Sequence, residues 1–265
     1  MAIGTLEDIH ILTYGRNEFT EELIRKHNKI FEKTAAGIPE NQKGQEVQLS
    51  VTKRAALTTT IWEDPTLRSS NVFPITPQES EELLQVNRLP NLGGYWEDLG
   101  LTLRLPKGQI QEDTVNPKES LRLYNALEED LKIGLFKNPF TNETYSLGIL
   151  TERILVVNPG FVPDPGMPLG GYFTVLHGLT QIYPHPIFQR EEREIKFEGY
   201  GLEFGLPFLN QLDKGDRNVY PPKKSSTGLM VLGRDGDLGL GARDEGIAFS
   251  GSAGWGIFAQ RAKKI

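Results

Sequence analysis

Two carboxylates and a lysine in this sequence have the spacing of a metal-dependent nuclease. Asp164 follows Pro163, and thirty residues later Glu194 and Lys196 flank Ile195 on a predicted strand. A nuclease of the PD-(D/E)xK type uses such a set to hold Mg²⁺ and to activate water. The pattern is short, and Asp164 lies in a Pro-rich loop of an acidic protein. The nuclease is therefore an alternative hypothesis and not the main one.

The histidines show no spacing that is typical of a metal site. The four are His10, His27, His177 and His185, and none belongs to a His-x-x-x-His or Glu-x-x-His pattern. His27 lies on the apolar face of a predicted helix, which favours a packed residue. His177 and His185 are expected to be hydrogen-bonded loop or strand residues, because nothing in the spacing identifies the carboxylate that a two-histidine metal site needs. We expect no metal and no cofactor.

A glycine-rich run at residues 233–241, GRDGDLGLG, invites two ligand-binding interpretations that both fail. A calcium loop needs an oxygen donor at the position of Gly239 and a distal glutamate. A phosphate-binding loop needs a Gly-Lys-Ser or Gly-Lys-Thr end and a following helix. We therefore predict a tight turn between two strands, stiffened by bonds from Asp side chains to the backbone.

Charge and composition exclude several classes of protein. Lys and Arg total 29 and Asp and Glu total 35 of 265 residues, so the net charge is −6, and a protein that grips phosphates needs a basic stripe. The absence of cysteine removes disulfides and thiol chemistry. Residues 1–14 show no secretory signal, and no run of 18 apolar residues occurs. We expect a soluble protein with no membrane partner and no sequence-specific nucleic-acid partner.

Three segments have the apolar periodicity of helices. Residues 18–36 repeat apolar side chains at helical spacing and stop at Gly37. Residues 76–86 begin with Thr76-Pro77-Gln78-Glu79, which predicts an N-cap, a proline at the first helical position and a capping box. Residues 117–135 follow Asn116 and carry one apolar stripe over about five turns. This last segment is the longest predicted helix.

Strands are predicted between the helical segments and mainly in the second half of the sequence. Alternation at residues 47–51 and a Thr-rich run up to Trp62 predict a long hairpin at 46–62 with a polar tip. Eighteen of the 28 glycines lie between Gly160 and Gly256, which indicates a region of strands and turns. Further strands are predicted at 101–105, 147–157, 172–176, 194–204, 228–232, 246–249 and 255–260. The long loops at 158–168 and 213–224 suggest contact segments.

Three segments near the C-terminal end resemble the closing strands of a known shell protein fold. They are GLMVLGRD at 228–235, RDEGI at 243–247 and GIFAQR at 256–261. The family is that of tailed-phage major capsid proteins and encapsulins. The resemblance implies an α+β capsid-type shell fold with an N-terminal helical arm at 1–45 and a mixed body at 46–265. The body would contain the hairpin at 46–62, the central helix at 117–135 and a strand-rich region at 146–265.

Self-assembly is also favoured without the resemblance. Extended segments with one apolar side bury little within a monomer, and an arm with Pro-rich loops is costly to order unless a neighbour fixes it. Symmetric association of identical copies supplies such a neighbour. We therefore expect a non-enzymatic structural subunit of a virus-like particle, a tailed-phage virion protein of capsid type. It would be made in the host cytoplasm, reside in the virion, and bind copies of itself and other virion proteins.

Several alternatives and contact sites follow from the same residues. A tail or baseplate component is one alternative, because the same composition would suit it as well as a capsid component. A small-ligand binding protein would have an enclosed pocket lined by Tyr172, Tyr183 and Phe188. If the protein assembles, the expected contacts between subunits are the hairpin tip at Thr52–Arg54, the arm before Phe19 and the closing strands.

Overall fold

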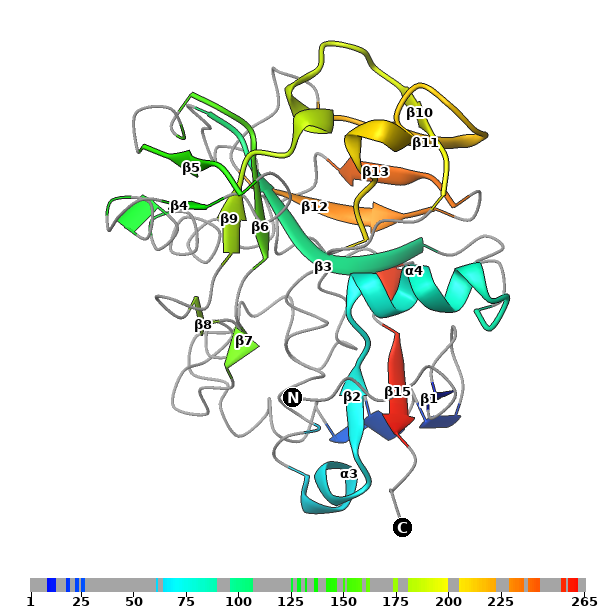
Figure 1. Cartoon of the computed structure of the whole chain (residues 1–265). Helices are drawn as coiled ribbons and strands as arrows, with labels where there is room; N and C mark the ends of the chain where they lie inside the picture. Colours follow the sequence, from blue (N-terminus) through cyan, green and yellow to red (C-terminus); the bar gives the residue numbers. More distant parts are fainter. Residues whose placement is uncertain are drawn as a thin grey trace, which may run out of the picture.

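The described residues form a large eight-stranded sheet, a small three-stranded sheet and two separate two-stranded pairs, with short helices beside them (Figure 1). The structure is a computed structural model. It describes residues 9–12, 18–19, 22–23, 25–26, 61, 64–89, 96–106, 125, 128–129, 132, 136–137, 142–146, 150, 152–158, 161–162, 174–175, 181–199, 205–222, 229–235, 238–243, 254–255 and 257–261.

The large sheet joins strands from distant parts of the sequence. Their hydrogen-bonded order is β10-β11-β13-β12-β3-β6-β9, with β14 beside the first residues of β3. Neighbours run antiparallel except for β11 with β13 and β14 with β3, which are parallel. The strands are β3 Trp96–Arg104, β6 Leu155–Asn158, β9 Gln181–Tyr183, β10 Ile195–Phe197, β11 Arg217–Tyr220, β12 Leu229–Arg234, β13 Leu240–Arg243 and β14 Gly254–Trp255.

Strand β3 is nine residues long and bends in its middle (Figure 1). Gly100, in the middle of the strand, has a φ of 71°, a backbone conformation that residues with a Cβ rarely adopt. At the same level the pairing with β12 shifts its register between Leu232 and Gly233. Such a bulge bends a strand and increases its twist. As a result, β3 curves over helix α4 (Pro77–Gln85) at one end and pairs with β6 at the other.

One side of the large sheet carries the main apolar core. Alternate leucines of β3 point to this side, from Leu99 to Leu105, and none is more than 2% exposed. This is the two-residue period of a strand with one buried face. Aromatic side chains of the second half complete the core, and burial of each large apolar side chain contributes about 1.5–3 kcal/mol. Among them are Tyr183, Phe188 and Phe197.

The small sheet brings the two ends of the described chain together. Its order is β1 (Ile9–Ile11), β15 (Phe258–Arg261) and β2 (Val72–Pro74), all antiparallel. Both faces are covered by apolar clusters. One contains Ile9, Ile75, Leu83, Leu84, Leu89, Ile257 and Ala259, and the other contains Leu23, Ile61, Val72 and Phe258. The small sheet therefore lies between α4 on one face and the helical residues Leu23 and Ile61 on the other.

Helix α4, at Pro77–Gln85, confirms the start predicted from sequence. Thr76 is the N-cap, and its hydroxyl accepts a hydrogen bond from the Glu79 backbone N–H at 3.1 Å. The Glu79 carboxylate accepts in return from the Thr76 N–H at 2.8 Å. Pro77 occupies the first position, where its missing N–H costs nothing. Three local residues thus determine where the helix begins.

The capping box gives a first prediction. Thr76→Ala removes the oxygen that accepts from the Glu79 N–H, and it should lower the free energy of unfolding by about 1 kcal/mol. Thr76→Ser keeps that oxygen and should stay close to the wild-type value. Urea unfolding followed by circular dichroism measures both. Equal stability of the alanine and serine variants would contradict the capping role.

The remaining elements are short. Helix α3 spans Pro65–Ser69, and its N-cap Asp64 accepts from the backbone N–H groups of Thr66 and Leu67 at 2.9 and 3.0 Å. A hydrogen bond from Lys26 lowers the pKa of Asp64, and the two backbone bonds add to that effect. The other short elements are η4 Pro186–Gln189, η5 Leu209–Gln211, β4 Phe136–Lys137, β5 Thr144–Tyr145, β7 Phe161–Val162 and β8 Thr174–Val175.

The predicted fold class was wrong. The described structure is mostly β, and the α-helices with defined bounds are α3 and α4, of five and nine residues. It is not a helix-rich α+β capsid-type shell fold with a long central helix. Of the range 117–135 the structure describes Asn125, Glu128, Glu129 and Lys132, which are helical. Apolar periodicity reports local structure, whereas the body of this fold is set by pairing between distant strands.

Individual strands were predicted better than the fold class. Residues 101–105 overlap β3, 228–232 overlap β12 and 255–260 overlap β14 and β15, as predicted. The predicted strand at 246–249 and residues 46–60 of the predicted hairpin lie outside the described residues. Ile61 is helical and buried, so the prediction of a strand there was wrong.

Candidate functional site

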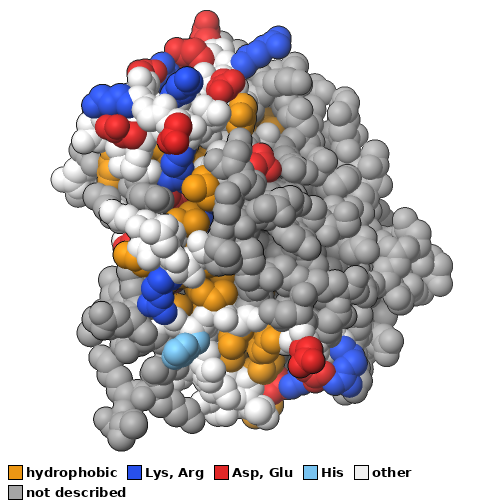
Figure 2. All heavy atoms as spheres, turned by 90° about the vertical axis from the view of Figure 1, so that its right-hand side faces the viewer, with side chains coloured by type: hydrophobic (Ala, Val, Ile, Leu, Met, Phe, Trp, Pro, Cys, Tyr) orange, Lys and Arg blue, Asp and Glu red, His pale blue; other side chains and the backbone are white. Residues whose placement is uncertain are grey.

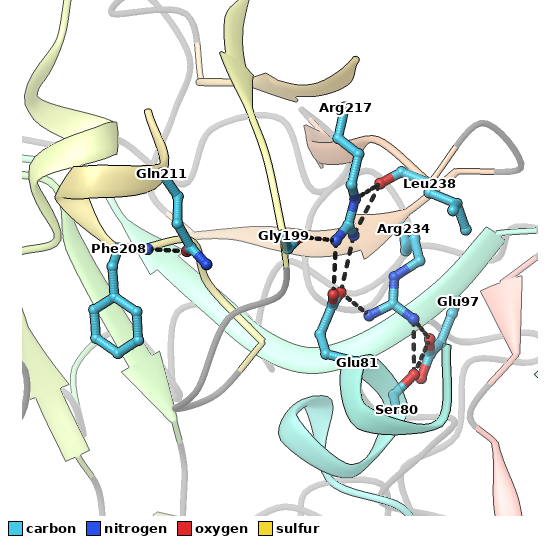
Figure 3. A network of polar contacts seen from close by, with 9 residues as sticks. All are labelled: Ser80, Glu81, Glu97, Gly199, Phe208, Gln211, Arg217, Arg234 and Leu238. Atoms are coloured by element: carbon cyan, nitrogen blue, oxygen red, sulfur yellow. Dashed lines mark hydrogen bonds and ion pairs between the residues drawn. The ribbon is translucent and has the colours of Figure 1, made fainter. Parts of the chain in front are cut away.

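The most extensive set of charged contacts in the described residues starts from helix α4. Ser80, Glu81, Leu83 and Leu84 all point to the buried side of this helix. The leucines enter the cluster that covers the small sheet. Ser80 and Glu81 face the large sheet, where two arginines and a glutamate meet them (Figure 3). A carboxylate this deeply buried needs charged partners.

Arg217 of β11 is the first partner. Its two terminal nitrogens donate to the two carboxylate oxygens of Glu81 at 2.8 and 3.1 Å, which is a bidentate ion pair. The same guanidinium donates to the backbone carbonyls of Gly199 and Leu238. Its charged carbon lies 4.5 Å from the centre of the Phe197 ring. Arg217 therefore ties α4 to the segment after β10 and to the loop between β12 and β13.

Arg234 of β12 is the second partner. It donates to Glu81, and its other terminal nitrogen donates to Glu97 and to the Ser80 hydroxyl, each at 2.7 Å. Glu97 lies opposite Arg234 in the β3–β12 register, so the two strands bring the pair together. The Ser80 hydroxyl also donates to Glu97 at 2.8 Å. We call Ser80, Glu81, Glu97, Arg217 and Arg234 the ionic clamp.

The ionic clamp is chemically closed. Its four charged side chains are 8% exposed or less, and two carboxylates balance two guanidinium groups. The Nε atom of Arg234 has no hydrogen-bond partner among the described residues, but it is buried as well. Charged groups that are paired with one another and buried in this way hold elements in place and do not meet a substrate.

The loop held by Arg217 is the glycine-rich run at 233–241. It joins β12 and β13 as an antiparallel hairpin, as predicted. The Asp235 N–H donates to the Gly239 carbonyl and the Leu238 N–H to the Asp235 carbonyl, at 2.8 and 2.9 Å. Leu238 has a φ of 64°, which costs a residue with a Cβ about 1 kcal/mol or more. The bonds from Arg217 to its carbonyl help to hold this turn.

The nuclease residues are only partly described. Glu194 and Lys196 are exposed, while Ile195 and Phe197 between and beside them are buried. Both charged side chains therefore lie on the solvent side of β10. Asp164 lies outside the described residues, and within the described ranges no three His, Cys, Asp or Glu side chains gather as a metal site would require.

Around β10 the surface carries many charges of both signs, which we call the charged rim. Figure 2 shows red and blue side chains together at this end of the molecule. Arg190 pairs with Asp213 at 2.8 Å and with Glu192 at 2.9 Å. Asp213 first, and then Glu192, raise the pKa of Arg190, while Arg190 lowers that of Glu192. The rim also includes Glu191, Arg193, Glu194, Lys196, Glu198, Lys214 and Asp216.

The described histidines are His10, exposed on β1, and His185, which is buried before η4. Burial lowers the pKa of His185 to about 4, although a backbone hydrogen bond with Pro207 opposes the shift. The expectation of a hydrogen-bonded loop residue is confirmed for His185. His27 and His177 lie outside the described residues.

Other predicted sites fall in the core or outside the described ranges. Tyr183 and Phe188 are fully buried in the main core, and Tyr172 is not described. The hairpin tip Thr52–Arg54 is also not described. The arm before Phe19 was expected to reach a neighbouring subunit, but its residues 9–11 form β1 within their own chain.

The closing strands were also expected at contacts between subunits, and that stays a prediction. β12 and β13 lie inside the large sheet, and β15 is the middle strand of the small sheet. Interior strands have both edges hydrogen-bonded to neighbours of the same chain, so their backbones cannot pair with another subunit.

Sequence reasoning missed the ionic clamp. Arg234 gave a signal, because it ends an apolar strand in which an inward arginine needs a buried partner. Nothing local identifies that partner: Glu81 lies 153 residues away from Arg234 and 136 away from Arg217. Only the packing of α4 on the sheet reveals the set.

Comparison of the chain with protein-family models, with curated proteins and with solved structures finds no match in any of the three. The resemblance of residues 228–261 to shell proteins therefore stays a prediction. The described part of the chain contains no helix with the length and apolar character needed to cross a lipid bilayer. Function must then be argued from the ionic clamp, the charged rim and the sheets.

Proposed function

We propose that this protein is a non-enzymatic structural subunit of a virus-like particle, of the tailed-phage virion class, that works by assembling with copies of itself. The observation that carries the proposal is the ionic clamp. It uses four buried charges to fix α4, the segment after β10 and the β12–β13 loop to one another. Catalytic charges, by contrast, are usually found in clefts that a substrate can enter.

The charged rim supports the same proposal by limiting where copies can meet. The outer edge of β10 is already occupied by its own chain: the Asp213 N–H donates to the Lys196 carbonyl, and the Glu198 N–H donates to the Gln211 carbonyl. An occupied edge with charged side chains resists uncontrolled strand pairing. A subunit present at high local concentration needs such protection, and assembly would then use other surfaces.

The fold does not point to one position of the subunit within the particle. The capsid-type shell fold is not the fold of the described residues, so the proposal covers tail and baseplate components as well. Assembly in any of these positions requires contacts between identical or sister subunits.

Size-exclusion chromatography with light scattering tests the proposal. At tens of micromolar and near-physiological salt we expect a species several times heavier than the 29.7 kDa chain, with a mass that falls on dilution. A monodisperse 30 kDa species over the whole concentration range would contradict self-assembly.

The nuclease is the rival hypothesis, because Glu194 and Lys196 share the solvent side of β10. Incubation with supercoiled plasmid and Mg²⁺ tests it, and our proposal expects no cleavage. Lys214→Ala, at another exposed lysine of the charged rim, is the matched control for Lys196→Ala. Cleavage that Lys196→Ala abolishes and Lys214→Ala retains would overturn the non-enzymatic assignment.

A further inference from the structure

His185 makes two hydrogen bonds that need one particular protonation state. It is the N-cap of η4, and its Nδ1 accepts from the Ile187 backbone N–H at 3.3 Å. A second hydrogen bond joins it to the backbone of Pro207. Proline has no N–H, so His185 must donate to the Pro207 carbonyl. With Nδ1 accepting, the single ring proton lies on Nε2.

These bonds connect two segments that are distant in sequence. On one side is η4, which Gln189 also fastens by donating to the Ile154 carbonyl at 2.7 Å. On the other side is the segment 205–212, whose Leu206 and Leu212 enter the main core. At its start, Gly205 passes so close to α4 that a Cβ there would lie 2.9 Å from the Pro77 carbonyl oxygen. His185 therefore lies at a joint between η4 and the segment that lies against α4.

A second proton would break this joint. Protonated Nδ1 becomes a donor and would face the Ile187 N–H, which is also a donor. The positive charge would be buried, because His185 is only 2% exposed. Its ring neighbour is Phe188, with centroids 5.9 Å apart, which supplies no counter-charge.

Charged groups on the elements around the joint are engaged elsewhere. Arg190 after η4 pairs with Asp213 after η5 at the charged rim. On α4, Glu79 closes the capping box and Glu81 belongs to the ionic clamp. The shifted pKa of His185 instead reflects burial, which lowers it, and the backbone hydrogen bond with Pro207, which opposes the shift.

We propose that His185 is an acid-sensitive joint, whose protonation frees the segment 205–212 from η4 while the large sheet stays folded. The inference does not depend on the proposed function. The sign follows from the pKa values: about 4 in the folded state and about 6.5 when exposed. The stabilisation that neutral His185 gives to the closed joint is therefore fully present above pH 6.5. This stabilisation is lost as the pH falls from 6.5 towards 4.

Hydrogen exchange with mass spectrometry tests the joint, with rates corrected for the intrinsic effect of pH. Between pH 7 and pH 5 we expect the opening constant of peptides covering 185–189 and 205–212 to rise by about twentyfold, because one proton binds on opening. Peptides of β3 and β6 should change much less. His185→Asn offers an acceptor for the Ile187 N–H without titrating, and it should remove the pH dependence. His10→Asn, at the exposed histidine, should leave it unchanged.

Three outcomes would overturn the proposal. One is the same pH dependence in His185→Asn as in the wild type. Another is an equal loss of protection in β3 and β6, which would indicate general acid unfolding. The third outcome is measured on the wild type, so it stays available if the Asn variant fails to fold. A proton on Nδ1 of His185 at pH 7, observed by nitrogen NMR, would exclude the joint as described.

Discussion

Glu81→Ala is expected to lower the free energy of unfolding by about 3–5 kcal/mol, the range for removing one member of a buried ion pair. Glu81 is the shared acceptor of Arg217 and Arg234, and its side chain is 1% exposed. Its loss leaves two guanidinium groups in the interior with one carboxylate, Glu97, on the Arg234 side alone. Equilibrium unfolding in urea, followed by tryptophan fluorescence, measures the effect.

Two comparisons separate loss of charge from loss of helix packing. Gln85→Ala changes an exposed residue of the same helix and should shift stability by less than about 0.5 kcal/mol. The double variant Glu81→Met with Arg217→Met removes both partners, and its cost should be less than the sum of the two single variants. Additive costs, or a loss below about 1 kcal/mol for Glu81→Ala, would show that the clamp charges are screened by solvent.

Gly215→Ala is expected to lower the free energy of unfolding by about 3 kcal/mol, which combines the cost of a left-handed conformation with a steric clash. Gly215 lies in the turn before β11 with a φ of 72°. A Cβ there would lie 2.5 Å from the Phe197 carbonyl oxygen and 2.9 Å from the Glu198 Cα. These are backbone atoms of the last residue of β10 and of the residue that follows it, so they cannot rotate away as the end of a side chain can.

Gly199→Ala is the matched control for this clash. Gly199 has a similar φ of 69°, but a Cβ there would first meet the end of the flexible Gln211 side chain, at 3.0 Å. It should therefore show mainly the conformational cost, about 1–2 kcal/mol. Equal losses in the two variants, measured by urea unfolding, would mean that the β10–β11 turn can move and that the clash contributes nothing.

The start of α4 and the β12–β13 hairpin show what was predictable from sequence. In both cases the information lies within ten residues: a threonine, a proline and a glutamate at the helix start, and a run of glycines between two apolar strands. Their energetics depend on bonds between near neighbours, so the local sequence is sufficient.

The fold class was not predictable in this way. Helical periodicity at 18–36 and 117–135 suggested a helix-rich shell fold, but pairing of β3 with β12 and β6, across more than fifty residues each, gives a mostly β structure. Residues 9–11 pair with β15 near the other end of the sequence. No pattern in a strand tells which distant strand it will join.

The sequence by itself determined the local features of this protein: the first turn of α4, the positions of several strands, the turn at 233–241 and the absence of cysteine chemistry. Tertiary structure alone decided the strand order, the ionic clamp and the placement of His185 between η4 and Pro207. The physical reason is range. Caps and turns are stabilised by groups a few bonds apart, whereas a buried charge or a neutral histidine depends on partners that only the folded chain brings within hydrogen-bond distance.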